Sequence, residues 1–247
     1  MERIILIETS TALCSAALAE DGVIVAYRES SAPKAHASLT AVFIREMLSE
    51  RGLGVSDCNA VCVSMGPGSY TGLRVGVSTA KGLCFGAGIP LIAVGTLETL
   101  VSQAAGIPGQ AGNDGKDGST ADYKYIVPMI DARRMEVYTA VWKPECDTAS
   151  ADSWKQITET APMIIDANSF ADILADGPVL FIGDGAGKCA DVLKHPNAHF
   201  LQCHPKASSM LAPAVRTYKE KRFEDVAYFE PFYLKEFVAT VSKKKLF

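Results

Sequence analysis

The stretch of residues 60–87, AVCVSMGPGSYTGLRVGVSTAKGLCFGA, constrains the fold more than any other part of the chain. It starts with an apolar run of strand length, turns through Gly66-Pro67-Gly68, and continues in a helical pattern for about five turns. Ser69 stands where an N-cap belongs, because its hydroxyl can accept a hydrogen bond from an early amide of the helix. This succession predicts a strand, a tight turn and a buried helix of an α/β protein.

The helix in this stretch has very little polar surface. Two charged residues, Arg74 and Lys81, interrupt an otherwise apolar or small sequence. A helix of this kind is normally buried on most sides, and small residues let another backbone come close. One face can pack on the chain's own sheet, so we expect a partner to cover the other. The first face is the apolar stripe Leu73, Val77, Ala80 and Cys84; the second consists of Gly72, Val75, Thr79, Gly82 and Gly86.

Composition limits the function classes and the compartment. The 247 residues are 48% hydrophobic and 21% charged, as expected for a globular protein, and the net charge of -4 gives no electrostatic reason to bind nucleic acid unaided. Seven cysteines lie mostly inside apolar runs, without a CxxC pair or a signal peptide. No apolar run approaches the length that spans a bilayer. We therefore expect a cytoplasmic protein with reduced core thiols and no membrane contact.

The first part of the chain reads as an antiparallel meander followed by alternating helices and strands. Three strands are expected at 3–8, 14–19 and 23–28, the last two joined by the hairpin signal Asp21-Gly22. A helix over 34–51 has two apolar faces, so it also requires two partners. The pattern continues with the strand 60–65, the helix 69–87, the strand 90–94 and a helix over 96–105.

The second part of the chain partly repeats this pattern. A strand-turn-strand over 125–130 and 135–142 surrounds Asp131-Ala132-Arg133 and echoes the turn at 8–11, and a strand at 178–182 runs into Gly183-Asp184-Gly185 as 60–65 runs into its own glycine turn. A short strand at 199–202 and a helix over 206–221 follow. We predict an α/β fold of two related halves, each a mixed sheet that opens with an antiparallel meander and is flanked by helices.

The predicted domain organisation follows from the same reading. The first half comprises residues 1–105 and carries the two helices 34–51 and 69–87. A flexible glycine-rich insertion, 106–122, separates it from the second half, 123–235, and a basic tail covers 236–247. The last helix, 206–221, belongs to the second half by position, and one alternative is that it packs back on the first.

Two glycine-rich turns raise the question of nucleotide binding. Residues 183–189, GDGAGKC, resemble a Walker A motif, but Ile182 replaces its first glycine and Cys189 replaces its magnesium-binding hydroxyl. Strand-to-helix turns can still hold phosphate through backbone amides. A degenerate nucleotide pocket with weak affinity therefore remains an alternative, formed by Glu8, Thr9, Ser10, Gly183, Asp184 and Gly185.

The sequence motifs typical of metal sites and of catalytic nucleophiles are incomplete in this chain. His195 and His199 stand four residues apart, but Pro196 follows the first and no HExxH glutamate accompanies them, so surface-loop histidines are the better interpretation. The sequence GPGSY is not a nucleophile elbow, and His36 is the one histidine in the first half. We predict no metal site and no catalytic residues.

Several segments together identify a family resemblance. IETST, CSAAL, HASLT, SMGPGSYTGLRVGVSTAKGL, DARRMEVY, FIGDGA and EPFYLKE, in this order over nearly the whole chain, resemble the TsaB (YeaZ) family. That family is similar to its catalytic relative TsaD, to the actin, hexokinase and sugar-kinase superfamily, and to the M22 glycopeptidase-like proteins. The resemblance implies a subunit of the complex that forms threonylcarbamoyladenosine beside the anticodon of tRNAs reading codons that begin with A.

The resemblance also implies partners and a binding surface. A member of this family is expected to be a non-catalytic scaffold that binds TsaD, forms a homodimer when alone, and meets the ATPase TsaE and tRNA within the complex. No cofactor of its own is implied, although the complex uses ATP. The alternatives are an ATPase or kinase of the same superfamily and an M22-like peptidase. The residues predicted to form the partner or dimer interface are Leu39, Phe43, Tyr70, Leu73, Arg74, Val77 and Lys81, and a charge introduced at Val77 is expected to abolish partner binding without affecting the fold.

Overall fold

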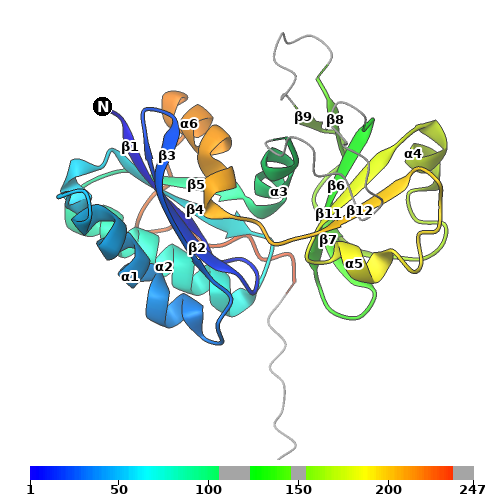
Figure 1. Ribbon diagram of the computed structural model, residues 1–247, viewed down its shortest axis with the longest axis horizontal. Helices are drawn as coiled ribbons and strands as arrows, with labels where there is room; N and C mark the ends of the chain where they lie inside the picture. Colours follow the sequence, from blue (N-terminus) through cyan, green and yellow to red (C-terminus); the bar gives the residue numbers. More distant parts are fainter. Residues whose placement is uncertain (106–122, 146–153, 236–247) are drawn as a thin grey trace, which may run out of the picture.

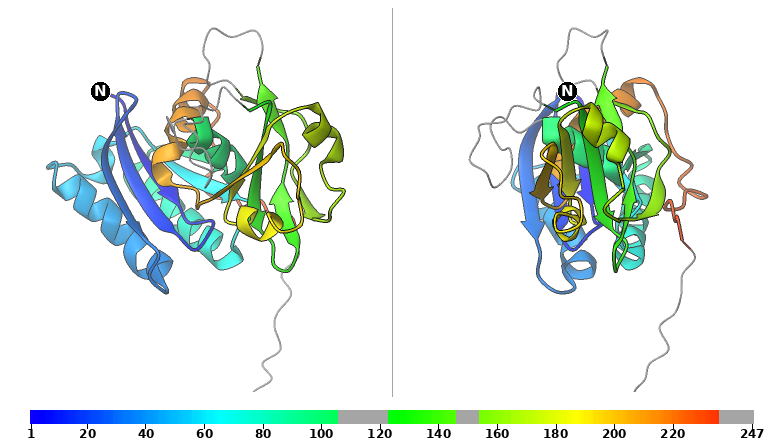
Figure 2. Two further views of the ribbon diagram at one scale, coloured as in Figure 1. Left: turned by 45° about the vertical axis from the view of Figure 1, so that its right-hand side comes forward. Right: turned by 90° about the vertical axis from the view of Figure 1, so that its right-hand side faces the viewer.

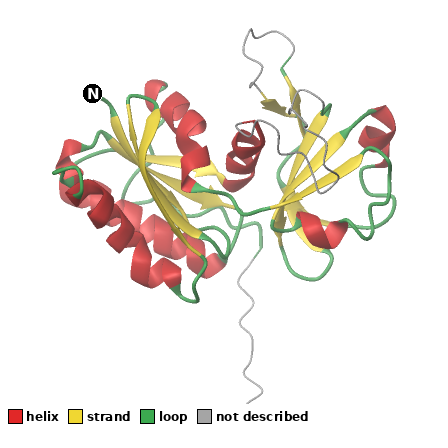
Figure 3. Cartoon of the chain, in the orientation of Figure 1, coloured by secondary structure: helices red, strands yellow, loops and turns green. Residues whose placement is uncertain are grey.

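The computed structural model describes residues 1–105, 123–145 and 154–235. Two β-sheets stand next to each other, with helices α3 and α6 near the junction and helices α1 and α2 on the far side of the first sheet (Figure 1). Figure 3 shows the same arrangement by element type. The insertion predicted at 106–122 and the tail predicted at 236–247 lie outside the described residues.

The first sheet has the strand order β3-β2-β1-β4-β5. Its first three strands are antiparallel, while β4 and β5 run parallel to β1, so each of the last two needs a helical crossover. The strands are β1 (Arg3–Glu8), β2 (Cys14–Glu20), β3 (Val23–Ser30), β4 (Ala60–Gly66) and β5 (Leu91–Gly95); the crossovers contain α1 (Ala35–Ser49), the short 3-10 helix η1 (Val55–Asp57) and α2 (Tyr70–Ala87).

The second sheet repeats this order with shorter crossovers. Its main path, β10-β7-β6-β11-β12, corresponds strand for strand to the first sheet, and β11 and β12 are again parallel to β6. The predicted fold class, α/β with two related halves, is therefore confirmed. The elements are β6 (Tyr125–Asp131), β7 (Glu136–Thr139), β10 (Ala161–Ile164), α4 (Ala171–Asp176), β11 (Val179–Gly183), α5 (Ala186–Cys189) and β12 (Ala198–Gln202).

The single strand predicted over 135–142 is wrong, because the chain forms two strands there. After β7 it forms β8 (Trp142–Pro144), which pairs with β6 at Ile126 and with β9 (Trp154–Gln156). Pro128 lies between the two pairing regions of β6 and has no amide for the ladder. The Thr139 hydroxyl donates to the Pro128 carbonyl at 2.8 Å, and the strand divides at this point.

The two faces of the first sheet bury different helices. Ile5 and Ile7 point toward α1 and α2, whereas Ile4 and Leu6 point to the opposite face, where they meet η3 (Ala207–Met210) and α6 (Leu211–Lys219). This alternation follows from the two-residue period of a strand. The helix predicted over 206–221 thus starts as a 3-10 turn, and it packs on the first sheet.

Helix α3 (Thr96–Ala105) packs on the second sheet, whereas α6 from later in the chain packs on the first. Although it follows the first half in sequence, Leu97 and Leu100 lie in a core with Ile126 and other residues of the second sheet. Gln103 of α3 also connects this helix to the segment that leads into η3. Its side-chain amide donates to the His204 carbonyl, and its side-chain oxygen accepts from the Lys206 amide. The views of Figure 2 place α3 and α6 next to each other between the sheets. The linear division at 106–122 therefore does not separate the two hydrophobic cores.

The chain returns to the first half once more, through the segment 222–235, which we call the strap. Glu224 bridges to Leu91 of β5, and the Phe232 amide donates to the Met65 carbonyl at 2.7 Å. Lys235, at the end of the strap, forms an ion pair with Glu136 of the second sheet. The strap thus runs from the edge of the first sheet to the second.

Candidate functional site

The N-terminal part of α2 is pressed against the turn that follows β1. A Cβ atom on Gly68 would lie 2.4 Å from the Ser10 carbonyl oxygen, and one on Gly72 would lie 2.1 Å from the Thr9 carbonyl oxygen. At Gly76 it would lie 2.2 Å from the Thr9 hydroxyl. Since these separations are far below van der Waals contact, only glycine fits. The small residues at this end let the helix approach its own chain.

The C-terminal part of α2 is open. Nothing lies within 4 Å of a Cβ built on Gly82 or Gly86, and Phe85 between them is 86% exposed. The exposed positions recur at helical spacing and form one outward stripe: Thr71, Arg74, Ser78, Gly82, Phe85 and Gly86. The prediction that the whole small-residue face awaits a partner is therefore wrong for Gly72, and the second small face is free only at its C-terminal end.

Three of the predicted interface residues belong to the chain's own core. Leu73 and Val77 are buried on the face of α2 that packs on the sheet, and Phe43 is buried on α1. The prediction that these residues offer a partner surface is wrong, because the sheet needs the apolar stripe of α2 to cover Val63 and its neighbours. A charge at Val77 would be placed in the core and would destabilise the fold.

The other four predicted residues lie nearer the surface. Leu39 is half-buried against the same core. Arg74 is exposed, with its guanidinium carbon 4.3 Å from the centre of the Tyr70 ring, and that ring lies 5.0 Å from the ring of Tyr233 in the strap. Lys81 instead holds the strap: its ammonium donates to the backbone carbonyls of Ala227 and Phe229 at 3.0 and 3.1 Å.

Glu8 lies at the end of β1, completely buried beneath the turn and α2. One carboxylate oxygen accepts from the Ser10 amide at 2.6 Å and from the Ser64 hydroxyl at 3.0 Å, and no cation pairs with the side chain among the described residues. Burial outweighs these hydrogen bonds and raises the pKa of Glu8 to about 7. Glu8 is therefore partly protonated near neutral pH.

A cavity of about 830 Å³ opens between the two halves. Of the residues predicted for a nucleotide pocket, Ser10 and Asp184 line it from opposite sides. Glu8 and Thr9 are buried and do not belong to its lining, and Gly183 and Gly185 pack on the carbonyl of Met129. Of the six residues predicted for a nucleotide pocket, the structure therefore places two in the cavity lining and the other four outside it.

Sequence reasoning missed several residues that line this cavity. They come from the turn after β6 and from the strap: Arg133, Arg134, Glu136, Tyr138, Phe232, Tyr233, Leu234 and Lys235. The available signal was the similarity between the turn at 131–133 and that at 8–11, since related halves place equivalent turns on either side of a shared cavity.

Sequence reasoning also missed the exposed Phe85 on α2, because its neighbours on the helix are small.

The described residues contain no group of three or more His, Cys, Asp or Glu side chains suited to a metal ion. His195 lies in a turn, where its Nδ1 accepts from the Asn197 amide at 3.2 Å. His199 lies in β12 with its ring edge against Tyr123. Among the helices of the described parts of the chain, none has the length and apolar character needed to cross a membrane.

Comparisons with known proteins place this architecture in a family. The chain is 30% identical over 243 residues to the tRNA threonylcarbamoyladenosine biosynthesis protein TsaB of Haemophilus influenzae, a match that covers 97% of this chain and 95% of the relative. The chain belongs to the TsaB (YeaZ) family. The Escherichia coli TsaB is 29% identical over 248 residues, covering 96% of each chain.

Three further matches connect the chain to related proteins. The family model described as TsaD, tRNA N6-adenosine threonylcarbamoyltransferase, matches residues 29–243. The transferase of Maricaulis maris is 43% identical, but over 67 residues that make up 18% of its length. The structure of YeaZ from Pseudomonas aeruginosa superimposes with a TM-score of 0.78, covering 95% of this chain and all of that one at 23% identity, so it shares the fold.

Proposed function

We propose that the chain is a non-catalytic subunit of the machinery that forms threonylcarbamoyladenosine in tRNA, and that it acts by binding a TsaD-like catalytic subunit. The nearly full-length match to TsaB proteins supports the pathway. In this proposal the chain forms a homodimer when it is alone, and it meets a TsaE-like ATPase and tRNA as part of the complex.

The observation that carries the partner proposal is the outward stripe of α2. Phe85 is almost fully exposed there, flanked by Gly82 and Gly86, which leave the helix backbone accessible. An exposed aromatic side chain beside accessible backbone is typical of a protein interface, where aromatic anchors supply much of the binding energy. Helix α1 lies next to α2 and extends the surface with small exposed residues, Ala37, Ser38 and Ala41.

The test is size-exclusion chromatography with light scattering, on the chain alone and mixed with the TsaD-like subunit of the same organism. The Phe85→Asp variant should lose the mixed species while its thermal unfolding stays close to that of the unchanged protein. Ile164→Asp is the matched control, since Ile164 is 73% exposed on β10 of the second half. It should bind as the unchanged protein does.

Two outcomes would contradict the proposal. If Phe85→Asp and Ile164→Asp both retain full binding, the stripe is not the interface. If the unchanged chain forms no mixed species with the TsaD-like subunit, the scaffold function itself is wrong.

A further inference from the structure

The strap runs along one side of α2, next to the outward stripe that the proposed function assigns to a partner. Beyond the middle of the helix, the Lys81 ammonium donates to the backbone carbonyls of Ala227 and Phe229. At the start of the helix, the centre of the Tyr70 ring lies 5.0 Å from that of the Tyr233 ring. Residues 70 and 81 are about three helical turns apart, so both contacts with the strap lie on the same side of α2. The strap therefore borders the stripe.

Residues 225–229 of the strap form a turn, which we call the strap turn, whose backbone is held from several directions. One carboxylate oxygen of Asp225 accepts from the Tyr228 amide at 3.2 Å, and the Asp225 carbonyl accepts from the Phe229 amide at 2.8 Å. Val226 and Phe229 pack against the core between the first sheet, α1 and α2. The hydrogen bonds from α2 hold the turn on the helix side. A turn fixed in this way loses little conformational entropy when a partner binds.

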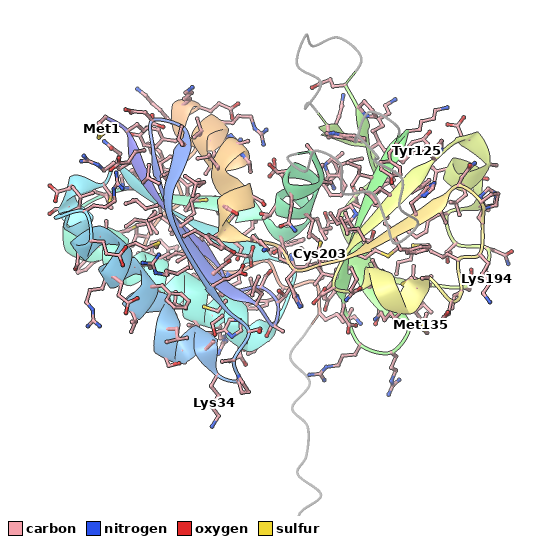
Figure 4. All side chains as sticks on the ribbon, viewed as in Figure 1. Met1, Lys34, Tyr125, Met135, Lys194 and Cys203 are labelled. Carbon is pink, nitrogen blue, oxygen red and sulfur yellow. The ribbon has the colours of Figure 1, made fainter. Side chains whose placement is uncertain are left out.

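Tyr228 is the side chain that the strap turn presents to solvent. It is 84% exposed, although the carbonyls of both its neighbours are bound to Lys81. Phe85 follows Lys81 by about one helical turn and is 86% exposed, so two large exposed rings lie on the same part of the surface. Lys34, labelled in Figure 4, stands at the start of α1 on the side of the first sheet that α2 also covers. An aromatic ring held in water by a fixed turn is typical of a binding anchor.

Carboxylates give the surface around the strap turn an excess of negative charge. Glu224, Asp225 and Glu230 are exposed, and none of them forms an ion pair with a described residue. The neighbouring positive charges on α2 are those of Arg74 and Lys81. A basic side chain of a protein partner is attracted to such a surface, and its cationic group can lie on the tyrosine ring. The phosphates of an RNA would be repelled.

We propose that the strap turn is a second contact region for the TsaD-like subunit, and that an arginine or lysine side chain of that subunit lies on the Tyr228 ring. This inference rests on the proposed function, because it takes the same partner and extends its contact from the α2 stripe to the strap. The interface then has two parts that respond differently to salt. The part around Phe85 is apolar, whereas the attraction between the carboxylates and a basic side chain is screened as the ionic strength rises.

The test is surface plasmon resonance, with the TsaD-like subunit of the same organism immobilised and the full chain in solution. Tyr228→Ala should weaken binding about tenfold, as expected when an aromatic anchor is removed, while Tyr228→Phe keeps the ring and should bind as the unchanged protein does. Glu230→Gln should slow association at low salt and have little effect at high salt. Ile164→Ala is the matched control, since Ile164 is 73% exposed on the second half, and it should leave the affinity unchanged.

Three results would overturn this proposal and leave the proposed function standing. If Phe85→Asp abolishes binding while Tyr228→Ala binds as the unchanged protein does, the strap turn lies outside the interface. If Tyr228→Ala dissociates the homodimer in light scattering and leaves the affinity for the TsaD-like subunit unchanged, the strap turn contacts a second copy of the chain. If Tyr228→Phe weakens binding as much as Tyr228→Ala, the hydroxyl and not the ring makes the contact. By contrast, a TsaD-like subunit that does not bind the unchanged chain removes both proposals. Thermal unfolding of each variant separates loss of binding from loss of fold.

Discussion

The two ends of α2 use glycine at the same helical spacing for opposite purposes. At the N-terminal end, Gly72 and Gly76 allow the helix to lie directly on the turn after β1. At the C-terminal end, Gly82 and Gly86 meet nothing within the chain and surround the exposed Phe85. A row of small residues on a helix therefore says that something approaches closely, but it does not say whether this is the same chain or another.

This difference also separates two kinds of constraint. A substitution at the N-terminal end should act on folding, because it forces two parts of one molecule apart. A substitution at the C-terminal end should act on association and should not destabilise the fold. The four predictions below test this division, beginning with the largest expected change in the free energy of unfolding.

Gly72→Ala should destabilise the protein by about 3 kcal/mol or more, because the added methyl group would overlap the Thr9 carbonyl oxygen and the backbone would have to move. Urea unfolding followed by circular dichroism measures this change. A loss below about 1 kcal/mol would mean that the turn and the helix can separate at little cost, which would contradict the proposed difference between the ends.

Glu8→Gln tests the turn after β1, against which the N-terminal end of α2 packs. The folded-state pKa of Glu8 is raised from 4.5 to about 7, so the carboxyl ionises at lower pH in the unfolded chain than in the folded protein. The unchanged protein therefore loses stability as the pH rises between these two values. The glutamine variant should escape this loss. It should therefore be more stable than the unchanged protein by about 3 kcal/mol at pH 8, with little difference at pH 4.5.

Unfolding free energies measured at pH 4.5, 6 and 8 test this prediction. A stability difference that does not change with pH would mean that Glu8 titrates normally in the folded protein. Glu46→Gln, at an exposed position of α1, serves as the control for the removal of a surface carboxylate.

Lys81→Met tests the middle of α2, where the helix holds the strap. The variant keeps the aliphatic stem but loses the two hydrogen bonds to the carbonyls of Ala227 and Phe229, and it should destabilise the protein by about 1 to 2 kcal/mol. Amide hydrogen exchange should increase in the strap more than in the sheets. Unchanged exchange there would show that the other strap contacts are sufficient.

Gly82→Ala should have the smallest effect, and its sign should be opposite to that of Gly72→Ala. The position is open, and alanine is the better helix former, so the free energy of unfolding should rise by about 1 kcal/mol. Denaturant unfolding of this variant beside Gly72→Ala compares the same methyl group at the two ends of one helix. If both variants are destabilised equally, the distinction between the ends is wrong.

The sequence predicted the fold well because local patterns determine it. The hairpin signal at Asp21-Gly22, the buried run of β4 and the cap at Ser69 each agree with the element that forms. The repeated turns at 8–11 and 131–133 correctly indicated two related halves. Strand β7 was misjudged because its break depends on Pro128 in a different strand, and a one-strand pattern does not contain that information.

The site was harder to predict than the fold. Apolar periodicity on α2 identified two faces, but it could not say which one meets the sheet, so Leu73 and Val77 were assigned to the wrong side. Lys81 has the pattern of an exposed charge, and its acceptors lie 146 and 148 residues away in sequence. The cavity depends on three segments distant in sequence, of which the turns were recognised and the strap was not.

The exchange of α3 and α6 between the sheets also determines the order in which the protein can be completed during synthesis. The amide of Ala207 donates to the Ser15 hydroxyl in β2, across 192 residues of sequence, and Met210 and Ala214 complete the core beside Ile4. On the ribosome the first sheet is made early, yet one of its faces stays uncovered until residues near 214 have left the exit tunnel. A nascent chain that stops before this point exposes an apolar sheet surface, which is the kind of surface that chaperones bind and that aggregates.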